Sequence, residues 1–328
     1  MKTPAYWYPD PQNKRSLWMA RLLSPASLLF RWGTRLRLLG IRAYASRIPL
    51  LCIGNVVAGG AGKTPTSLAI ARLLIDQGHH PAFVTRGYGG RLSGVIRVDP
   101  SRHTVQEVGD EALLLAALAP TWIGRDRAAV VREAEKHADI LIMDDGLQNP
   151  SLRPSASLLV LDGETGIGNG RMIPAGPLRE PLSQAMARAK AAVIIGQKDR
   201  QNLAPLLGIP VFRAQLVPVL PSNFPHGGSF IAFAGLARPQ KLYTTARDLG
   251  LDLIETVDFP DHHVFSEKDL KKMQHMALVH NALLLTTEKD AVRLPDSFRK
   301  NVFVLPVRLV FDDPAAPTQL LSLLGLSL

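Results

Sequence analysis

A glycine-rich turn that ends in Gly-Lys-Thr carries the clearest chemistry in the sequence. The apolar run Leu50–Ile53 precedes it, and a helical pattern follows from about Lys63 to Gln77. Glycines let the backbone approach phosphate oxygens, and a helix N-terminus adds a positive dipole end. The lysine can reach the β- and γ-phosphates, and the threonine hydroxyl can bind magnesium. The sequence thus predicts an ATP and Mg²⁺ site formed by Gly59, Gly60, Ala61, Gly62, Lys63, Thr64 and Pro65, with Lys63 also catalytic.

This turn departs from the strict phosphate-loop motif at one position. The motif has glycine six residues before the lysine, where Val57 stands here. The alternative is an ordinary glycine-rich turn that ends in the same three residues by chance. Because the tripeptide lies between a predicted strand and a predicted helix, we favour the phosphate loop.

Two adjacent carboxylates follow another apolar strand, Ile140–Met143. Acids at a strand end can hold the magnesium ion that accompanies ATP, so we predict a metal site made of Thr64, Asp144 and Asp145. Asp144 is the first choice for metal contact, directly or through water, and Asp145 is expected to face the reacting phosphate. The alternative is a turn in which an aspartate caps the next segment. The phosphate loop in the same predicted domain favours the metal site.

Cations follow two other predicted strands. Arg86 and Tyr88 lie in a glycine-rich loop that is either a mobile lid over phosphate or an ordinary flexible loop. Arg125 and Arg127, further along the chain, are open to the same two interpretations. The residues alone do not decide between them.

Asp110 and the adjacent histidines His262 and His263 are also ambiguous. Asp110 precedes an apolar helical run, and on sequence alone we interpret it as the helix N-cap. Neighbouring histidines point in different directions and no cysteine is nearby, which disfavours a zinc site. One histidine beside a carboxylate could act as a general base. Without further information, a solvated turn is the default interpretation.

The elements that must position these residues alternate between strands and helices, which predicts a parallel sheet. Ligands bind beyond the carboxyl ends of the strands in such sheets. The loops that follow the strands should therefore form the site. The further strands that we predict are Ala82–Thr85, Thr121–Ile123, Leu158–Leu161, Ala192–Ile195 and Leu283–Leu285.

Composition excludes several classes of protein. A hydrophobic share of 46% fits a chain with a sizeable core, and no apolar run reaches the roughly 18 residues of a spanning helix. The N-terminal residues lack the apolar stretch of a signal peptide. Cys52 is the only cysteine, which excludes an internal disulfide and a cysteine-based zinc cage and fits a reducing cytoplasm.

The positive charge is concentrated at the N-terminus. Residues 1–47 hold nine basic residues and one acid, a net charge of +8 out of +10 for the chain. The spacing of its apolar residues predicts two short amphipathic helices, interrupted at Pro25 and Gly33. We interpret them as an anchor that lies on an anionic membrane surface. The alternatives are packing on the domain behind and a nucleic-acid-binding arm. The expected apolar side consists of Trp18, Leu22, Leu29, Trp32, Leu36 and Leu39, flanked by Arg21, Arg31, Arg35 and Arg42.

The expected fold is an α/β chain in three parts. We predict a basic amphipathic arm over 1–47, a phosphate-loop kinase domain over 48–222, and a smaller α/β domain over 223–328 that contributes to the active-site cleft. The length of 328 residues alone favours two domains.

Together these segments resemble the tetraacyldisaccharide 4'-kinase family over most of the chain, up to residue 294. Each motif is modest, but seven in one order are highly specific. The matching stretches are Gly54-Asn55 with Gly59–Pro65, Thr85–Gly89, Gly109–Glu111, Asp144–Gly146 with Gln148, Pro174–Pro181, Asp261–His263 and Thr287–Val292.

The resemblance implies ATP- and Mg²⁺-dependent phosphorylation of the 4'-hydroxyl of a tetraacylated glucosamine disaccharide 1-phosphate. It places the protein peripherally on the cytoplasmic face of the bacterial inner membrane. It also implies that Asp110 is the catalytic carboxylate and His262 its partner, which together orient and deprotonate the sugar hydroxyl. Further candidate contacts with substrate or phosphate are Arg86, Tyr88, Glu111 and Gln148.

The sequence departs from the family pattern in two places. The family usually has phenylalanine and histidine where Leu147 and Asn149 stand, and Thr or Ser where Ala61 stands. Any role of that histidine is lost here or taken by an amide. Neither departure removes an element that we consider indispensable.

The main alternative function is a membrane-associated regulatory ATPase of the partitioning type. Its loop carries a lysine where Ala58 stands here, which argues against it. A nucleic-acid-binding module is disfavoured because charge outside the arm is nearly balanced. We infer no obligate protein partner.

Overall fold

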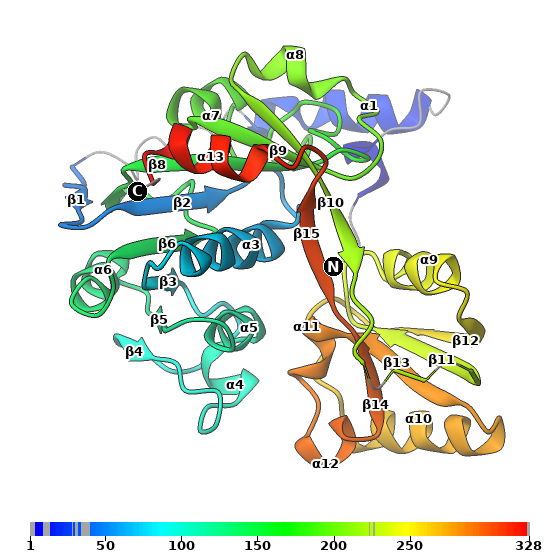
Figure 1. Ribbon diagram of the computed structural model, residues 1–328. Coiled ribbons are helices and arrows are strands. Elements are labelled where there is room, and N and C mark those ends of the chain that lie inside the picture. Colours follow the sequence, from blue (N-terminus) through cyan, green and yellow to red (C-terminus); the bar gives the residue numbers. More distant parts are fainter. Residues whose placement is uncertain are drawn as a thin grey trace.

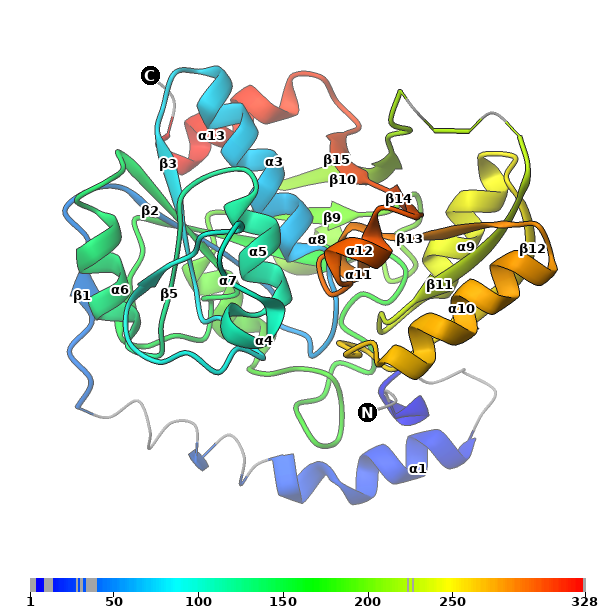
Figure 2. The same ribbon diagram turned by 90° about the horizontal axis from the view of Figure 1, so that it is seen from below.

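The computed structural model consists of a large sheet, a small sheet and an N-terminal segment (Figures 1 and 2). It describes residues 4–8, 14–27, 29, 32–33, 40–222, 224–225 and 227–326. None of the helices in these ranges is long and apolar enough to cross a membrane.

The large sheet has nine strands in the order β15-β10-β9-β8-β2-β6-β3-β5-β4. The inner strands are parallel, and the edge strands β15 and β4 are antiparallel to their neighbours. The central strands are buried along their whole length, as expected for continuous apolar runs covered on both faces. Their bounds are β2 Leu50–Gly54, β3 Pro81–Thr85, β4 Ile96–Arg97, β5 Thr121–Ile123, β6 Ile140–Asp144, β8 Ala156–Asp162, β9 Ala191–Ile195, β10 Val211–Pro218 and β15 Val307–Phe311.

Helices cover both faces of this sheet (Figure 1). On one face, α3 (Lys63–Asp76), α5 (Asp110–Ala116) and α13 (Ala316–Leu324) contribute residues to one apolar core. On the other face, α6 (Arg127–Ala134), α7 (Leu182–Arg188) and α8 (Leu203–Leu207) contribute to a second core. The predicted parallel sheet of a phosphate-loop fold is confirmed. The remaining short elements of this part are β1 Tyr44–Ala45, which pairs with β7 Leu152–Arg153, and α4 Val105–Val108.

The small sheet is parallel, with the order β12-β11-β13-β14. Its strands are β11 Ser229–Ala234, β12 Asp252–Asp258, β13 Leu283–Thr287 and β14 Val302–Leu305. Helix α9 (Gln240–Asp248) packs on one face, and α10 (Glu267–Val279) and α12 (Asp296–Arg299) pack on the other. The short helix α11 (Glu288–Ala291) follows β13 directly.

The chain passes between the two sheets twice. Strand β10 leaves the large sheet, and β15 returns to it as an antiparallel partner of β10 (Figure 1). The predicted second domain spans 223–328. Its C-terminal part belongs instead with the large sheet, because β15 is a strand of that sheet and α13 packs on it. The physical reason is the apolar face of α13, whose Leu320, Leu321 and Leu324 are buried in the core beside α3.

The N-terminal segment begins with a short 3-10 helix, η1 (Ala5–Trp7), and continues into α1 (Lys14–Leu22). Trp7 Nε1–H donates to the Pro174 carbonyl at 3.0 Å, which fastens η1 to the loop between β8 and α7. Helix α1 lies apart from both sheets in Figure 2 and ends at Leu22. The chain is helical again over residues 24–27, so Pro25 lies inside a helical stretch, and Gly33 is helical as well. Of the expected arm residues, Arg31, Arg35, Leu36 and Leu39 lie outside the described part of the chain.

Candidate active site

The phosphate loop joins the end of β2 to the start of α3. Gly62 has φ +87°, and a Cβ there would lie 2.5 Å from Cδ1 of Ile195, so both the backbone and the space require glycine. Pro65 stands in the first turn of α3, where its missing N–H costs no helical hydrogen bond. Lys63 Nζ donates to Asn55 Oδ1 at 3.4 Å and lies 3.6 Å from Asp145 Oδ1.

Asp144 is fully buried at the end of β6, beside β2. It accepts hydrogen bonds from Thr64 Oγ1 at 3.0 Å and from Ser67 Oγ at 2.9 Å. The structure thus brings Thr64 and Asp144 together, as the metal-site prediction requires. Burial raises the pKa of Asp144, and the nearby Glu111 raises it further. A buried carboxylate beside a hydroxyl oxygen is a fitting donor set for Mg²⁺, which prefers oxygen ligands.

Asp145 lies in a left-handed conformation, with φ +54°, and points its carboxylate toward two cations. Arg179 Nη1 donates to Asp145 Oδ1 at 3.0 Å, and Lys63 Nζ lies 3.6 Å from the same oxygen. Burial alone would raise the pKa of Asp145, but the charges of Lys63 and Arg179 outweigh burial and lower it. Arg179 belongs to a stretch that resembles the family, but the sequence did not single it out.

Asp110 and His262 are in contact although 152 residues separate them, with Nδ1 of His262 at 2.9 Å from Oδ2 of Asp110. Asp110 is the first residue of α5, on one face of the large sheet, and His262 follows β12 of the small sheet. The N-cap interpretation of Asp110 is wrong, because Gly109 occupies that position. His262 does lie in a turn, but its imidazole contacts Asp110 instead of facing only solvent. Their catalytic roles stay a prediction.

The backbone around this pair is closely packed. His262 has φ +57°, and its N–H donates to the Gly235 carbonyl at 3.2 Å. The exposed Tyr88 packs edge-on against the His262 ring, with centroids 5.8 Å apart. A Cβ at Gly109 would collide with the Tyr88 carbonyl, so the Tyr88 loop is held against the start of α5. His263 turns away, and its Nε2 lies 3.1 Å from Asp269 Oδ2.

Arg293, which sequence reasoning missed, completes this cluster. Its Nε donates to Asp110 Oδ2 at 2.9 Å, and its Nη2 reaches the same oxygen. Its Nη1 donates to Asp290 Oδ1 at 3.0 Å and to the Gly235 carbonyl at 2.9 Å. Burial raises the pKa of Asp110, but the His262 hydrogen bond and the charges of Lys289 and Arg293 outweigh it and hold the pKa well below its usual range.

The other candidate contacts fall into two groups. Glu111 pairs with Lys289 at 3.2 Å, and Gln148 donates to the Asn55 carbonyl at 2.8 Å, so both brace the site. Arg86 is exposed at the end of β3, and no contact fixes its side chain among the described residues. Asn149, in place of the family histidine, accepts from the N–H of Ser151 at 2.8 Å and so stabilises its own turn.

Arg127 lies at the start of α6 with only 6% of its surface exposed, whereas Arg125 is exposed. Burial lowers the pKa of Arg127 to about 10, and the charge of Asp145 opposes this shift. Its Nη1 atom is buried and has no hydrogen-bond partner in the described part of the chain. Arg127 is therefore a buried charged donor at the start of α6 and not a solvated loop residue.

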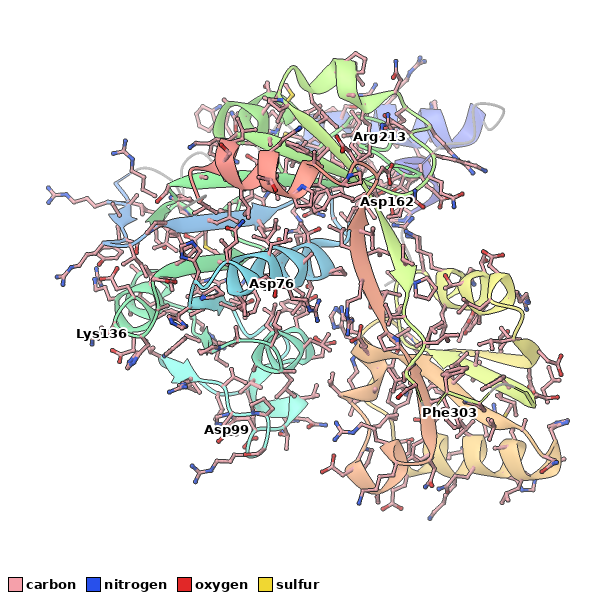
Figure 3. The ribbon with its side chains drawn as sticks, viewed as in Figure 1. Asp76, Asp99, Lys136, Asp162, Arg213 and Phe303 are labelled. Carbon is pink, nitrogen blue, oxygen red and sulfur yellow. The ribbon has the colours of Figure 1, made fainter. Side chains whose placement is uncertain are left out.

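A cluster of charges brings the small sheet against the phosphate loop. Asp162 at the end of β8, labelled in Figure 3, accepts from Lys241 Nζ at 2.6 Å and from Arg238 Nη2 at 2.9 Å. Arg238 Nη2 also donates to the carbonyl of Gly60 at 3.1 Å. Burial raises the pKa of Asp162, but Lys241 and Arg238 outweigh burial and lower it to about 2. The Asp162 carboxylate therefore stays ionised near neutral pH.

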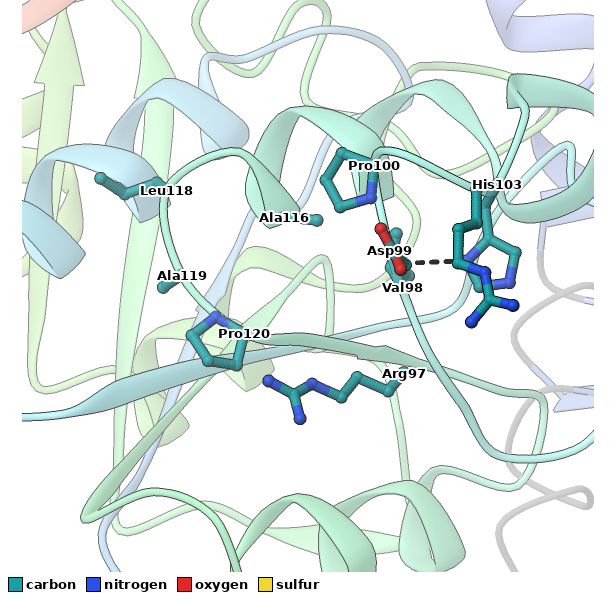
Figure 4. A pocket seen from close by; sticks show the side chains of 10 residues that line it. Arg97, Val98, Asp99, Pro100, His103, Ala116, Leu118, Ala119 and Pro120 are labelled. Carbon is teal, nitrogen blue, oxygen red and sulfur yellow. Dashed lines mark hydrogen bonds between the residues drawn. The ribbon is translucent and has the colours of Figure 1, made fainter.

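A cavity of about 600 Å³ lies elsewhere, beyond the C-terminal end of α5 (Figure 4). Arg97, Asp99 and His103 line it together with apolar residues. Asp110 stands at the opposite end of α5, so the cavity is not part of the site described above.

The chain matches the model of the family described as tetraacyldisaccharide-1-P 4'-kinase over residues 19–325. It belongs to this kinase family. The family prediction is therefore confirmed, and the family match argues against the alternative of a partitioning-type ATPase.

Similar proteins cover nearly the whole chain. A tetraacyldisaccharide 4'-kinase of Rhodospirillum centenum is 47% identical over 326 residues, which are 98% of this chain and 96% of that protein. One of Gluconobacter oxydans is 46% identical over 98% of both chains. A solved structure of LpxK from Aquifex aeolicus in complex with ATP matches with a TM-score of 0.77 and 25% identity, over 94% of this chain and 98% of that one.

Proposed function

We propose that this chain transfers the γ-phosphoryl group of ATP to the 4'-hydroxyl of a tetraacylated glucosamine disaccharide 1-phosphate. The observation that carries this proposal is the 2.9 Å contact between Asp110 and His262. Asp110 begins α5 and Lys63 begins α3, and these two helices are in contact on the same face of the large sheet. A sugar hydroxyl is a weak nucleophile, and a paired imidazole and carboxylate can orient and deprotonate it.

Each side chain of the phosphate site has a task in this proposal. The phosphate loop and Lys63 bind the β- and γ-phosphates and offset the charge that moves during transfer. Thr64 and Asp144 would hold Mg²⁺, which supplies charge neutralisation on the phosphate oxygens when it is bound. Asp145 keeps Lys63 and Arg179 close to the reacting phosphate. Asp110 and His262 place the acceptor hydroxyl for attack.

Analysis of the reaction product tests this function. We expect the purified protein, with ATP, Mg²⁺ and the acceptor in detergent micelles, to add one phosphate to the acceptor, which mass spectrometry and phosphorus NMR would locate at the 4'-position. An acceptor that lacks the 4'-hydroxyl is the matched control and should gain none. Release of free phosphate regardless of acceptor would instead support a regulatory ATPase, and absence of turnover would contradict the proposal.

We further propose that the N-terminal arm binds the cytoplasmic face of the inner membrane, where its lipid acceptor lies. The large apolar side chains Trp18, Leu22, Leu29 and Trp32 are between 59% and 76% exposed. They belong to a segment of net charge +8. Aromatic and leucine side chains next to cations suit an interface of acyl chains and anionic headgroups.

Replacing these four apolar residues with serine should weaken co-sedimentation with anionic liposomes by more than about tenfold, because each buried side chain contributes on the order of 1.5–3 kcal/mol. The apparent KM for the lipid should rise more than that for ATP. Leu278→Ser is the matched control, because Leu278 is 80% exposed on the small sheet's helix α10. Unchanged binding in the arm variant, or after deletion of residues 1–40, would leave the arm as a packing element.

A further inference from the structure

The side chain of Arg293 is 2% exposed, yet it is absent from every set of residues that the sequence suggested for catalysis. It follows α11 of the small sheet, and its guanidinium reaches Asp110 of the large-sheet part. All three of its nitrogens are engaged: Nε and Nη2 with Asp110, and Nη1 with Asp290 and Gly235. A planar guanidinium bound on two sides fixes the carboxylate that it contacts more firmly than a lysine could.

The hydrogen bonds of Asp110 show how the pair can work. Oδ2 accepts a hydrogen bond from the guanidinium of Arg293 and lies 2.9 Å from Nδ1 of His262. Oδ1 accepts from the Glu111 N–H at 2.8 Å. Both carboxylate oxygens thus face protein donors. On His262, Nε2 remains on the far side of the ring, where the closest charged neighbour is Asp261 at 3.9 Å. The His262 side chain is 35% exposed, whereas that of Asp110 is 4% exposed.

We infer that Arg293 is a positioning residue for phosphoryl transfer, which holds Asp110 as the ionised partner of His262 and leaves Nε2 of His262 to receive the proton of the acceptor. This inference rests on the proposed kinase function. The acceptor O–H bond breaks, its proton moves to Nε2, and the oxygen attacks the γ-phosphorus. The bond between the γ-phosphorus and the bridging oxygen breaks, and ADP leaves. Asp110 stabilises the imidazolium and does not take the proton.

The charges around Asp110 support this division of roles. Arg293, Lys289 and His262 all approach the carboxylate from the small-sheet side. Arg293 also donates a hydrogen bond to Asp290. Glu111 adjoins it on α5 and is paired with Lys289. The cations favour an ionised Asp110, so the proton on Nδ1 stays with the histidine. Without Arg293, the same buried carboxylate would bind a proton more readily.

Arg293→Met tests the inference, because methionine keeps much of the length and removes the charge and the donors. Single-turnover transfer from ATP to the lipid acceptor should slow by about 10²-fold, within the usual range of general-base effects. The KM for ATP should change little, since the phosphate contacts lie elsewhere. The acid limb of the pH profile of kcat should move to higher pH as Asp110 protonates more easily. Arg293→Lys should recover part of the rate and keep the limb near its original position.

Matched variants separate positioning from folding. Arg299→Met removes an arginine of the same unit whose only described ion pair is with Asp296, and it should keep wild-type kcat. If Arg293→Met does not fold, Arg293→Lys alone decides, since it retains the buried charge and loses the bidentate geometry. The double variant Arg293→Met/Asp110→Asn should be little slower than Asp110→Asn.

Wild-type kcat in both Arg293 variants would overturn the inference. So would a loss confined to thermal stability or to the KM for ATP with an unmoved pH profile, because that pattern belongs to a buried ion pair that only joins the two sheets. Failure of the wild-type protein to phosphorylate the acceptor would instead contradict the proposed function. The two failures are therefore distinguishable in one set of assays.

Discussion

Replacing either Lys63 or Asp144 with alanine should reduce phosphoryl transfer by at least about 10²–10³-fold, the usual effect of removing one group that stabilises charge in the transition state. Lys63 is the cation of the phosphate loop, 3.6 Å from Asp145. Asp144 is the buried carboxylate that Thr64 and Ser67 contact at the end of β6. Both variants should bind ATP and Mg²⁺ more weakly, and single-turnover transfer measures the loss in rate.

The control for this prediction is Lys136→Ala. Lys136, labelled in Figure 3, is an exposed lysine of the same part of the chain, and its only described ion pair is with Glu133. It should keep the wild-type rate. Circular dichroism of the Lys63 and Asp144 variants should show an intact fold. Near-normal turnover in either correctly folded variant would mean that this loop is not the ATP site.

Asp110→Ala and His262→Ala should each lower kcat by about 10²–10⁴-fold, the usual scale of general acid–base catalysis. The two side chains meet at 2.9 Å, and each depends on the other: Asp110 orients the imidazole, and the imidazole faces the acceptor. ATP binding should survive in both variants, because the contacts to phosphate that we propose are made by Lys63 and Thr64. Isothermal titration with a non-hydrolysable ATP analogue checks this point.

His263→Ala is the matched control for the histidine. His263 adjoins His262 in the chain but contacts Asp269 at the start of α10 instead of Asp110. It should lose stability, not catalytic rate, since Asp269 belongs to the capping box of that helix. Equal loss of kcat in the His262 and His263 variants would mean that the whole turn, and not one imidazole, matters for activity.

Local features of the fold were predictable from the sequence, whereas long-range contacts were not. The predicted strands of the large sheet are short apolar runs, and the structure has a strand at each of them. The return of β15 and α13 to the large sheet leaves no local signal, because an apolar strand and helix can pack on either sheet. Only the tertiary contacts of α13 decide the matter.

The site divides in the same way. Lys63 and Thr64 are neighbours in one motif and could be predicted from it. Asp144 could be predicted because it follows an apolar strand. The contact of Asp110 with His262 spans 152 residues, and that with Arg293 spans 183 residues. Sequence alone gave Asp110 only a helix-capping role, and the family resemblance supplied the pairing. Arg293 stands just beyond the last matching stretch, and only its burial between two carboxylates draws attention to it.

The central claim is that Asp110 and His262, from the two halves of the molecule, act as one unit on the acceptor hydroxyl. Single-turnover transfer of γ-labelled phosphate from ATP to the lipid acceptor, measured for the wild type, the two alanine variants and their double variant, tests it most directly. We predict that the double variant is little slower than the slower single variant, because residues that act as a unit are strongly non-additive. Rate losses that multiply would mean that the two residues work independently and would contradict the account.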